Sequence, residues 1–267
     1  KLLQTPKTER ERSNMLVISA NSDKGGVGKT TTVKNLAEKL RLFSKVLMID
    51  LDDSGNLTTG FGEFESTENT VIDLFEKGNV HPFSIKENLD LIPGHKLVSA
   101  LKERLISRRQ REIILARWIA RNYAYLSENY DYILIDTEND EGILTQNALI
   151  ASDIVLSIAM PGVDDFSAAL NLSTFVNELN IDFDTHTQVL LMANRIDKRA
   201  NRSKELIQTL ERFDNYIGYL PQLDILYEKQ SIYSSDAARK NKAGFETVDM
   251  FFQNLVTKIQ EIAKEVA

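Results

Sequence analysis

Short apolar runs alternate with longer segments of helical hydrophobic spacing along most of this chain. The runs, each about as long as a strand, are 15–20, 45–51, 89–92, 132–136, 154–159, 188–194 and 216–220. Most of them are continuously apolar, which is typical of strands that are buried on both faces of a parallel sheet. The pattern therefore predicts the α/β fold class, with a mainly parallel, twisted β-sheet covered by helices on both faces.

Apolar positions recur at helical spacing between these runs. We expect helices at about 29–42, 70–77, 96–129, 144–151, 165–179, 202–213 and 246–266. The last segment carries a single apolar stripe, which consists of Val248, Phe251, Phe252, Leu255, Ile259, Ile262 and Val266. Its polar face mixes lysines with glutamates, whereas helices that lie on membranes are strongly basic on that face. We therefore expect the stripe to pack on the core.

Composition limits the domain organisation and the chemistry. The chain has 267 residues, 42% of them hydrophobic, and no Pro/Gly/Ser-rich linker divides it. We predict a flexible N-terminal arm over residues 1–13 and a single domain over residues 14–267. The chain has no cysteine, which excludes disulfides, thiolate zinc sites and iron–sulfur clusters. Its three histidines are scattered, which argues against a histidine metal site.

Charge and hydropathy limit the partners and the location. The formal net charge of −7 argues against a protein that coats nucleic acid with its whole surface, but it leaves room for a local basic patch. No apolar run reaches the length of a membrane span, and no secretory signal is visible. We therefore expect a cytoplasmic protein that has no membrane partner.

Residues 21–32, with the sequence NSDKGGVGKTTT, lie between the first expected strand and the first expected helix. A glycine-rich turn in this position binds phosphate, because its backbone N–H groups converge on the anion at the positive end of a helix. Lys29 would contact the outer phosphates, and the Thr30 hydroxyl would bind Mg²⁺. The predicted nucleotide-binding residues of this loop are Lys24, Gly25, Gly26, Val27, Gly28, Lys29, Thr30 and Thr31.

Two expected strands end in aspartate at the edge of the sheet where ligands bind in parallel folds. Asp136 follows one apolar strand and fits the Walker B role of holding Mg²⁺ through water. Asp50 and Asp52 follow another, and their side chains share one side if the strand continues that far. One of these two carboxylates could then complete the magnesium shell while the other orients the attacking water.

These stretches resemble the ParA/MinD family of deviant Walker A ATPases. Lys24 to Thr32 (KGGVGKTTT) is similar to the family's deviant Walker A box, and Lys45 to Thr58 (KVLMIDLDDSGNLT) is similar to its second box. Residues 131–149 look like the Walker B region, and the resemblance covers most of residues 14–222. The plasmid-partition branch, ParA, fits best, including the delta-type partition ATPases of Gram-positive plasmids.

The resemblance implies a role for each matching residue. Lys24 would be the signature lysine, a catalytic group that reaches the partner's nucleotide across an ATP-dependent homodimer. Asp52 would be the catalytic aspartate that positions the hydrolytic water. Asp136 would be the Walker B magnesium residue, and it joins Thr30 and Asp50, inferred above from their positions, in the predicted magnesium site. Asn194 would contact the adenine, and the backbone at Pro221 would close over the base. The implied cofactors are ATP and Mg²⁺.

The sequence departs from the family pattern at three places. Asp53 replaces the proline that usually follows the catalytic aspartate, and Glu138-Asn139 replaces the usual Pro-Pro after Walker B. Asp23 stands where the standard phosphate loop has a glycine, and it adds a carboxylate near the phosphates. We expect these substitutions to slow hydrolysis or to alter the motion of the switch loops, which are the loops that follow the catalytic aspartate and the Walker B strand.

Two partners follow from the resemblance to the partition branch. The first is DNA, bound without sequence preference by ATP-loaded, nucleoid-associated protein. The candidate contacts are Arg195, Lys198, Arg199, Arg202, Lys204, Arg239, Lys240 and Lys242. Such contacts would make binding steeply dependent on salt, whereas the alternative for these residues is a solvated helix face. The second partner would be a centromere-binding protein that stimulates hydrolysis. The charged N-terminal arm is a candidate docking site for it, and the alternative for this arm is a disordered tail.

Three other functions remain open. A MinD-like, membrane-associated regulator of cell division would bind liposomes rather than DNA in the presence of ATP. A metabolic enzyme on the same fold would need a second polar pocket for its acceptor, and the sequence does not reveal one. A non-hydrolysing binding module would show no ATP turnover stimulated by DNA and a partner peptide.

Overall fold

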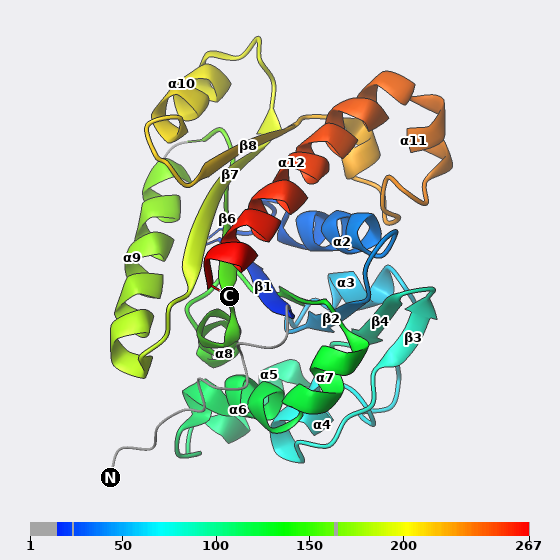
Figure 1. Cartoon of the computed structure of the whole chain (residues 1–267), viewed down its shortest axis with the longest axis vertical. Coiled ribbons are helices and arrows are strands. Elements are labelled where there is room, and N and C mark those ends of the chain that lie inside the picture. Colours follow the sequence, from blue (N-terminus) through cyan, green and yellow to red (C-terminus); the bar gives the residue numbers. More distant parts are fainter. Residues whose placement is uncertain (1–14, 23, 163–164, 267) are drawn as a thin grey trace.

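The computed structural model describes residues 15–22, 24–162 and 165–266. Within these ranges the chain forms one sheet with the strand order β3-β4-β2-β5-β1-β6-β7-β8 (Figure 1). The strands are β1 Leu16–Asn21, β2 Val46–Asp50, β3 Phe83–Lys86, β4 Leu89–Ile92, β5 Tyr132–Asp136, β6 Ile154–Ala159, β7 Gln188–Ile196 and β8 Tyr216–Pro221. All neighbouring pairs are parallel except β3 and β4, so the predicted fold class is confirmed.

Helices cover both faces of the sheet (Figure 1). They are α2 Lys29–Leu40, α3 Asn56–Thr59, α4 Val71–Glu76, α5 Val98–Leu105, α6 Ile114–Arg121, α7 Tyr123–Asn129, α8 Ile143–Ala151, α9 Asp165–Phe183, α10 Asn201–Leu210, α11 Asp236–Lys240 and α12 Lys242–Val266. Helices α2 and α12 pack on one face, and α4, α5, α6 and α8 pack on the other. Helices α9 and α10 extend the second layer over β6 and β7.

The alternation of side chains along each central strand decides which layer a residue joins. In β1, Leu16 and Ile18 belong to the core under α2, whereas Val17 belongs to the opposite core. Asp50 and Asp136 are register partners at the carboxyl ends of β2 and β5. By this alternation both carboxylates lie on the face that α2 covers, next to the phosphate loop that begins this helix.

The segment predicted as one helix over 96–129 is broken in the structure. It forms α5, a short 3₁₀ turn at Arg111–Ile113, α6 and α7. Helix α5 ends at Leu105, and Gln110, whose backbone is left-handed with φ 54°, immediately precedes the 3₁₀ turn. The apolar spacing continues across the breaks because Leu115, Trp118 and Leu126 all reach the same core. Hydrophobic spacing therefore could not reveal the breaks.

Other differences lie at the edges of the sheet. The short antiparallel strand β3 and the five-residue helix α11 were not predicted. Strand β2 ends at Asp50, so Asp52 lies in the following loop and the premise of a longer strand was wrong. The predicted arm over residues 1–13 lies outside the described residues.

The apolar stripe of α12 is part of the core. Val248, Phe252, Leu255 and Ile259 are fully buried in the cluster that includes α2 and the central strands. The prediction that this stripe packs on the core is therefore confirmed. Within the described ranges, the helices are all too short or too polar to cross a membrane.

Candidate nucleotide-binding site

The turn between β1 and α2 has the backbone shape that the glycine pattern predicts. Gly26 and Gly28 have φ values of 73° and 103°, in the left-handed region where a side chain is strained. Gly28 is the N-cap of α2, and a Cβ atom built on it would lie 2.1 Å from the Asn194 amide nitrogen. Gly25 and Gly26 are exposed, whereas Val27 is anchored in the core. The loop thus presents backbone at the positive end of a twelve-residue helix, which is a site for an anion.

Lys29 is the first residue of α2 and is buried. Burial lowers the pKa of its ammonium group, and the negative charge of Asp136, followed by that of Asp52, opposes this shift. A buried cation at a helix N-terminus is suited to binding the outer phosphates of a nucleotide. The phosphates would supply the negative charge that the carboxylates around Lys29 provide only in part.

Asp136 ends β5 and is completely buried. Neither of its carboxylate oxygens has a hydrogen-bond partner of good geometry within the described part of the chain. Burial and the nearby Asp50 raise the pKa of Asp136 well above its usual range, and the Thr30 hydroxyl and Lys29 only partly oppose this. We regard the Thr30 interaction as weak, because it does not meet hydrogen-bond geometry. A buried carboxylate left in this condition is poised for a cation.

The oxygen donors around Asp136 fit Mg²⁺. Asp136 offers carboxylate oxygens without a protein partner, and the half-buried Thr30 hydroxyl lies on the first turn of α2. Hard oxygen donors beside a phosphate site are the ligands that Mg²⁺ takes when it also binds phosphate oxygens. Lys29 and the loop amides would then hold the same phosphates from the other side.

Asp50 is also fully buried, but the protein satisfies it. Its Oδ2 accepts hydrogen bonds from the Thr58 backbone N–H at 2.9 Å and the Thr58 hydroxyl at 2.6 Å, and its Oδ1 accepts from the Asp52 N–H at 3.2 Å. The Thr58 hydroxyl in turn accepts from the Gly94 N–H at 2.8 Å. Burial raises the pKa of Asp50 to about 6, against these hydrogen bonds. Of the two aspartates, Asp136 is the one left open to a metal, and Asp50 ties β2 to α3.

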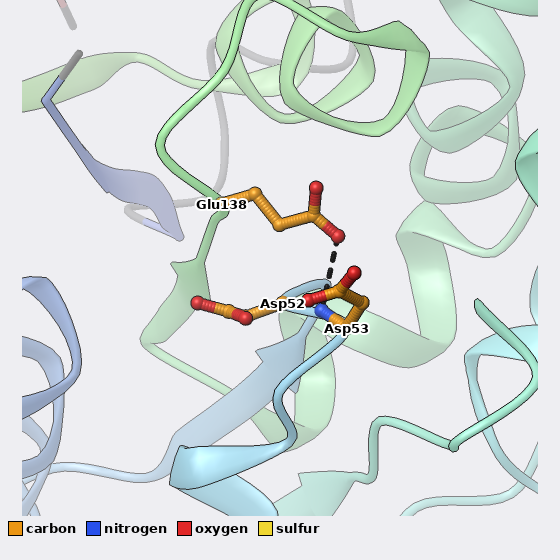
Figure 2. Close-up of side chains that lie close together, drawn as sticks. All are labelled: Asp52, Asp53 and Glu138. Atoms are coloured by element: carbon orange, nitrogen blue, oxygen red, sulfur yellow. Dashed lines mark hydrogen bonds between the residues drawn. The ribbon is translucent and has the colours of Figure 1, made fainter. Parts of the chain in front are cut away.

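Asp52 lies in the turn that follows β2. Its Oδ1 accepts hydrogen bonds from the Ser54 N–H at 2.8 Å and the Ser54 hydroxyl at 2.6 Å, and its carbonyl accepts from the Gly55 N–H at 3.0 Å. Asp52, Asp53 and Glu138 form an acidic cluster whose carboxylate oxygens lie within 4.8 Å of one another (Figure 2). The structure thus brings Asp52 near Asp136 and Lys29 from the loop, without the strand extension on which its shared face with Asp50 depended.

Lys24 begins the loop and is half-buried, and its backbone N–H donates to the Ser22 hydroxyl at 3.4 Å. Its predicted partner is the nucleotide of a second subunit, so its role stays a prediction. Asp23, for which we predicted an effect on hydrolysis or on loop motion, lies outside the described residues.

Asn194 braces the phosphate loop in this structure. Its amide nitrogen donates to the Val27 carbonyl at 2.7 Å, and its amide oxygen accepts from the Arg195 N–H at 2.8 Å. Pro221 ends β8 and pairs in register with Ile196, so it lies near this residue at the same edge of the sheet. Contact of Asn194 and Pro221 with a nucleobase stays a prediction, but both lie beside the loop.

The eight candidate DNA contacts fall into two separate groups. The first follows β7 into α10, and the second lies on α11 and the start of α12, at opposite corners of one end of the molecule (Figure 1). Several of these cations already interact with the protein. The Arg199 guanidinium pairs with Asp197 at 3.0 Å, and Arg239 pairs with Asp236 at 3.0 Å. The Arg195 guanidinium lies over the Tyr227 ring, 5.2 Å from its centroid.

Sequence reasoning missed residues that support the site from other elements. The Thr58 hydroxyl holds Asp50 and is itself held by the Gly94 N–H, and a Cβ atom on Gly94 would lie 3.1 Å from the Asp50 carboxyl carbon. Lys102 of α5 forms an ion pair with Glu138. The pKa of Glu138 is raised, because the effect of burial outweighs the opposing effect of Lys102. The sequence signal for Glu138 was its unusual place after the Walker B strand. Nothing in the sequence around Glu138 indicates Lys102 as its partner, because the two residues are more than thirty positions apart.

Comparison with known proteins agrees with this geometry. Residues 15–188 match the family described as an AAA domain. The sporulation initiation inhibitor protein Soj of Bacillus subtilis is 33% identical over 210 residues, which cover 74% of this chain and 79% of Soj. The virulence plasmid ParA family protein pGP5-D of Chlamydia psittaci is 33% identical over 205 residues, which cover 73% of this chain and 76% of that protein.

Solved structures share the fold at lower identity. A putative plasmid partition protein of Borrelia burgdorferi bound to AMPPNP superposes with a TM-score of 0.74 at 23% identity, covering 94% of this chain and 99% of that chain. An ATP complex of Cyanothece McdA gives a TM-score of 0.78 at 20% identity, covering 94% and 96%. The phosphate loop, the strand-end aspartates and the sequence relatives lead to one conclusion: the chain belongs to the P-loop ATPase family of Soj and the ParA partition proteins.

Proposed function

We propose that this protein is an ATP-dependent DNA partition ATPase. It dimerises on binding ATP and Mg²⁺, binds DNA without sequence preference, and is reset by hydrolysis that a centromere-binding partner stimulates. The observation that carries most weight is the buried, unpartnered carboxylate of Asp136 beside Lys29 at the N-terminus of α2. The sequence relatives named for chromosome and plasmid partition support the biological role.

The phosphate loop provides the binding half of the reaction. The N–H groups that precede α2 and the Lys29 ammonium group would hold the phosphates, while Thr30 and Asp136 would hold Mg²⁺. The bound ion supplies positive charge to the outer phosphate oxygens. Lys29 needs little rearrangement for this role, because its side chain is already buried among the carboxylates that the ligand would face.

Asp52 and Lys24 provide the catalytic half. Asp52 lies in a turn fixed by hydrogen bonds to Ser54 and is only half-buried, so its carboxylate can orient a water for attack on the outer phosphate. Lys24, contributed by the second subunit, would add positive charge where negative charge accumulates in the transition state. Because the second subunit supplies this lysine, hydrolysis and dimerisation are coupled.

The two basic groups support a DNA-binding role. Lys198, Arg202 and Lys204 are exposed around the start of α10, and Lys240 and Lys242 are exposed at the junction of α11 and α12. A dimer would present each group twice, which favours contact with the DNA backbone over a long stretch. The MinD-like alternative has less support, because the apolar stripe of α12, which would bind a membrane, is buried against the sheet and α2.

The proposal is tested by measuring the molar mass in solution with ATP, with ADP and without nucleotide, in the presence of Mg²⁺. We expect a dimer only with ATP. Lys24→Ala should prevent the ATP-dependent dimer and lower turnover by about 100-fold, since one charge-stabilising group is lost. The matched control is Lys45→Ala, an exposed lysine at the opposite end of β2. A Lys24→Ala protein that dimerises and hydrolyses ATP like the parent would exclude the role across the dimer.

DNA binding is tested by the salt dependence of affinity with ATP present. Each lost phosphate contact should reduce the slope of log affinity against log salt by about 1. We expect this reduced slope in one of two double variants, either Lys198→Ala/Arg202→Ala or Lys240→Ala/Lys242→Ala. The variant that shows the reduced slope identifies the basic group that binds DNA. Lys258→Ala, on the exposed side of α12, is the control. ATP-dependent affinity that does not change with salt would contradict binding through the backbone of DNA.

A further inference from the structure

A chain of contacts joins the two loops that follow β2 and β5. The Asp53 backbone N–H, in the first loop, donates to Glu138 Oε1, in the second, at 3.0 Å (Figure 2). Glu138 Oε2 forms an ion pair with the Lys102 ammonium group of α5. One turn earlier on α5, the Ser99 hydroxyl lies 3.4 Å from Asp53 Oδ2. Helix α5 therefore contacts both loops at once.

Burial gives the Glu138 link its weight. The side chain of Glu138 is 11% exposed and that of Lys102 is 25% exposed, so water screens this ion pair only partly. Asp140 lies 3.8 Å from the same ammonium group. Lys102 is thus the cation that allows Glu138 to sit beside Asp52 and Asp53, whose like charges would otherwise drive the loops apart.

The position of Asp52 depends on this link. Asp52 accepts hydrogen bonds from Ser54 within its own turn, and these bonds shape the turn. The start of the turn is attached to the end of β5, because the Leu51 N–H donates to the Asp136 carbonyl at 2.9 Å. The bond from Asp53 to Glu138 adds a second attachment, which joins the turn itself to the loop after Asp136. It requires an N–H at position 53, which a proline there would lack, and an acceptor at position 138. Both are present at positions where this sequence departs from its family's pattern.

We propose that Glu138 is a positioning residue. It accepts a hydrogen bond from the Asp53 N–H and is held by Lys102, and in this way it fixes the turn that carries Asp52 in position relative to Asp136. This inference rests on the proposed ATPase function and adds a residue to it. Glu138 acts through Asp52 rather than on the nucleotide, so its loss should affect the chemical step more than ATP binding.

The test compares Glu138→Ala with the double variant Lys102→Met and Glu138→Gln. The double variant keeps an acceptor for the Asp53 N–H and removes both charges, so no unpaired charge remains buried. We expect Glu138→Ala to lower kcat by about tenfold with the KM for ATP within about twofold. The double variant should retain kcat within about threefold. Glu141→Ala, an exposed glutamate of the same loop, should change neither.

Amide hydrogen exchange in the nucleotide-free protein provides a second readout that needs no activity. Glu138→Ala should speed exchange at residues 52–55, whereas the double variant and Glu141→Ala should not. A parent protein without ATP turnover would contradict the proposed function, and the exchange data would still decide the role of Glu138. Unchanged exchange and unchanged kcat in Glu138→Ala would overturn the inference, as would a double variant as impaired as Glu138→Ala.

Discussion

Helix α2 connects two buried carboxylate clusters that differ in one respect. At its N-terminus, Asp136 is fully buried, and its oxygens have no hydrogen-bond partner of good geometry in the described part of the chain. Further along, Glu38 is 1% exposed and forms ion pairs with Lys86 and with Arg41, the latter at 2.5 Å, while the Ser234 hydroxyl donates to it at 3.2 Å. Asp136 thus lacks hydrogen-bond partners of good geometry among the described residues, whereas Glu38 has two cations and a hydroxyl.

The pKa values of the two groups shift in opposite directions. Burial works to raise the pKa of Glu38, but hydrogen bonds and charges from Lys86 and Arg41 outweigh it and leave the pKa lowered. Burial raises the pKa of Asp136, and Asp50 adds to the effect. Equal burial therefore has different meanings: a carboxylate that supports the fold has its cations within the chain, whereas one that serves a ligand is left for that ligand to complete.

The largest expected effect comes from Asp136→Asn. It removes the charge that would hold Mg²⁺, so ATP turnover should fall by about 100-fold. The same change removes a buried, unpaired charge, so the free energy of unfolding without nucleotide should stay unchanged or rise by about 1 kcal/mol. Steady-state turnover and denaturant unfolding measure the two effects. A variant that is both active and less stable would place Asp136 with Glu38 as a structural group.

The next effect is on the other cluster. Glu38→Gln removes the charge shared by Lys86 and Arg41, and we expect the free energy of unfolding to fall by about 2 kcal/mol. This lies below the full value for a buried pair, because the Lys86 side chain is 34% exposed and water screens it. Denaturant unfolding measures the loss, and Glu261→Gln, from an exposed pair with Lys258, is the control. ATP affinity should not change in either variant, which separates this cluster from the site.

The smallest of the three effects concerns Asn194. Asn194→Ala removes the hydrogen bond to the Val27 carbonyl, so ATP affinity should fall by about fivefold, equivalent to about 1 kcal/mol. Calorimetric titration measures this. Asn215→Ala is the matched control, since the Asn215 amide donates to the Val189 carbonyl at 2.9 Å, away from the loop. Equal affinity in the two variants would show that Asn194 does not support the phosphate loop.

Periodicity predicted the central strands well because each is a continuous apolar run buried on both faces. It was less successful where tertiary contacts override local spacing. The break at Gln110 and the antiparallel strand β3 have no distinct hydrophobic signature, since the residues around them still contact the same cores or the sheet edge. The same limit applies to α11, which is five residues long and carries little periodicity.

The sequence by itself determined the phosphate loop, the strand-end aspartates and the α/β class. Glycine spacing fixes a left-handed turn before a helix, and continuous apolar strands fix a parallel sheet, so both follow from local chemistry. Only the tertiary structure decided which aspartate is left without partners. Thr58 satisfies Asp50, and the N–H of the distant Gly94 donates in turn to the Thr58 hydroxyl, whereas among the described residues the Asp136 oxygens have no hydrogen-bond partner of good geometry. The pairing of Glu138 with Lys102 and Asp53 was decided in the same way, because it joins three separate segments.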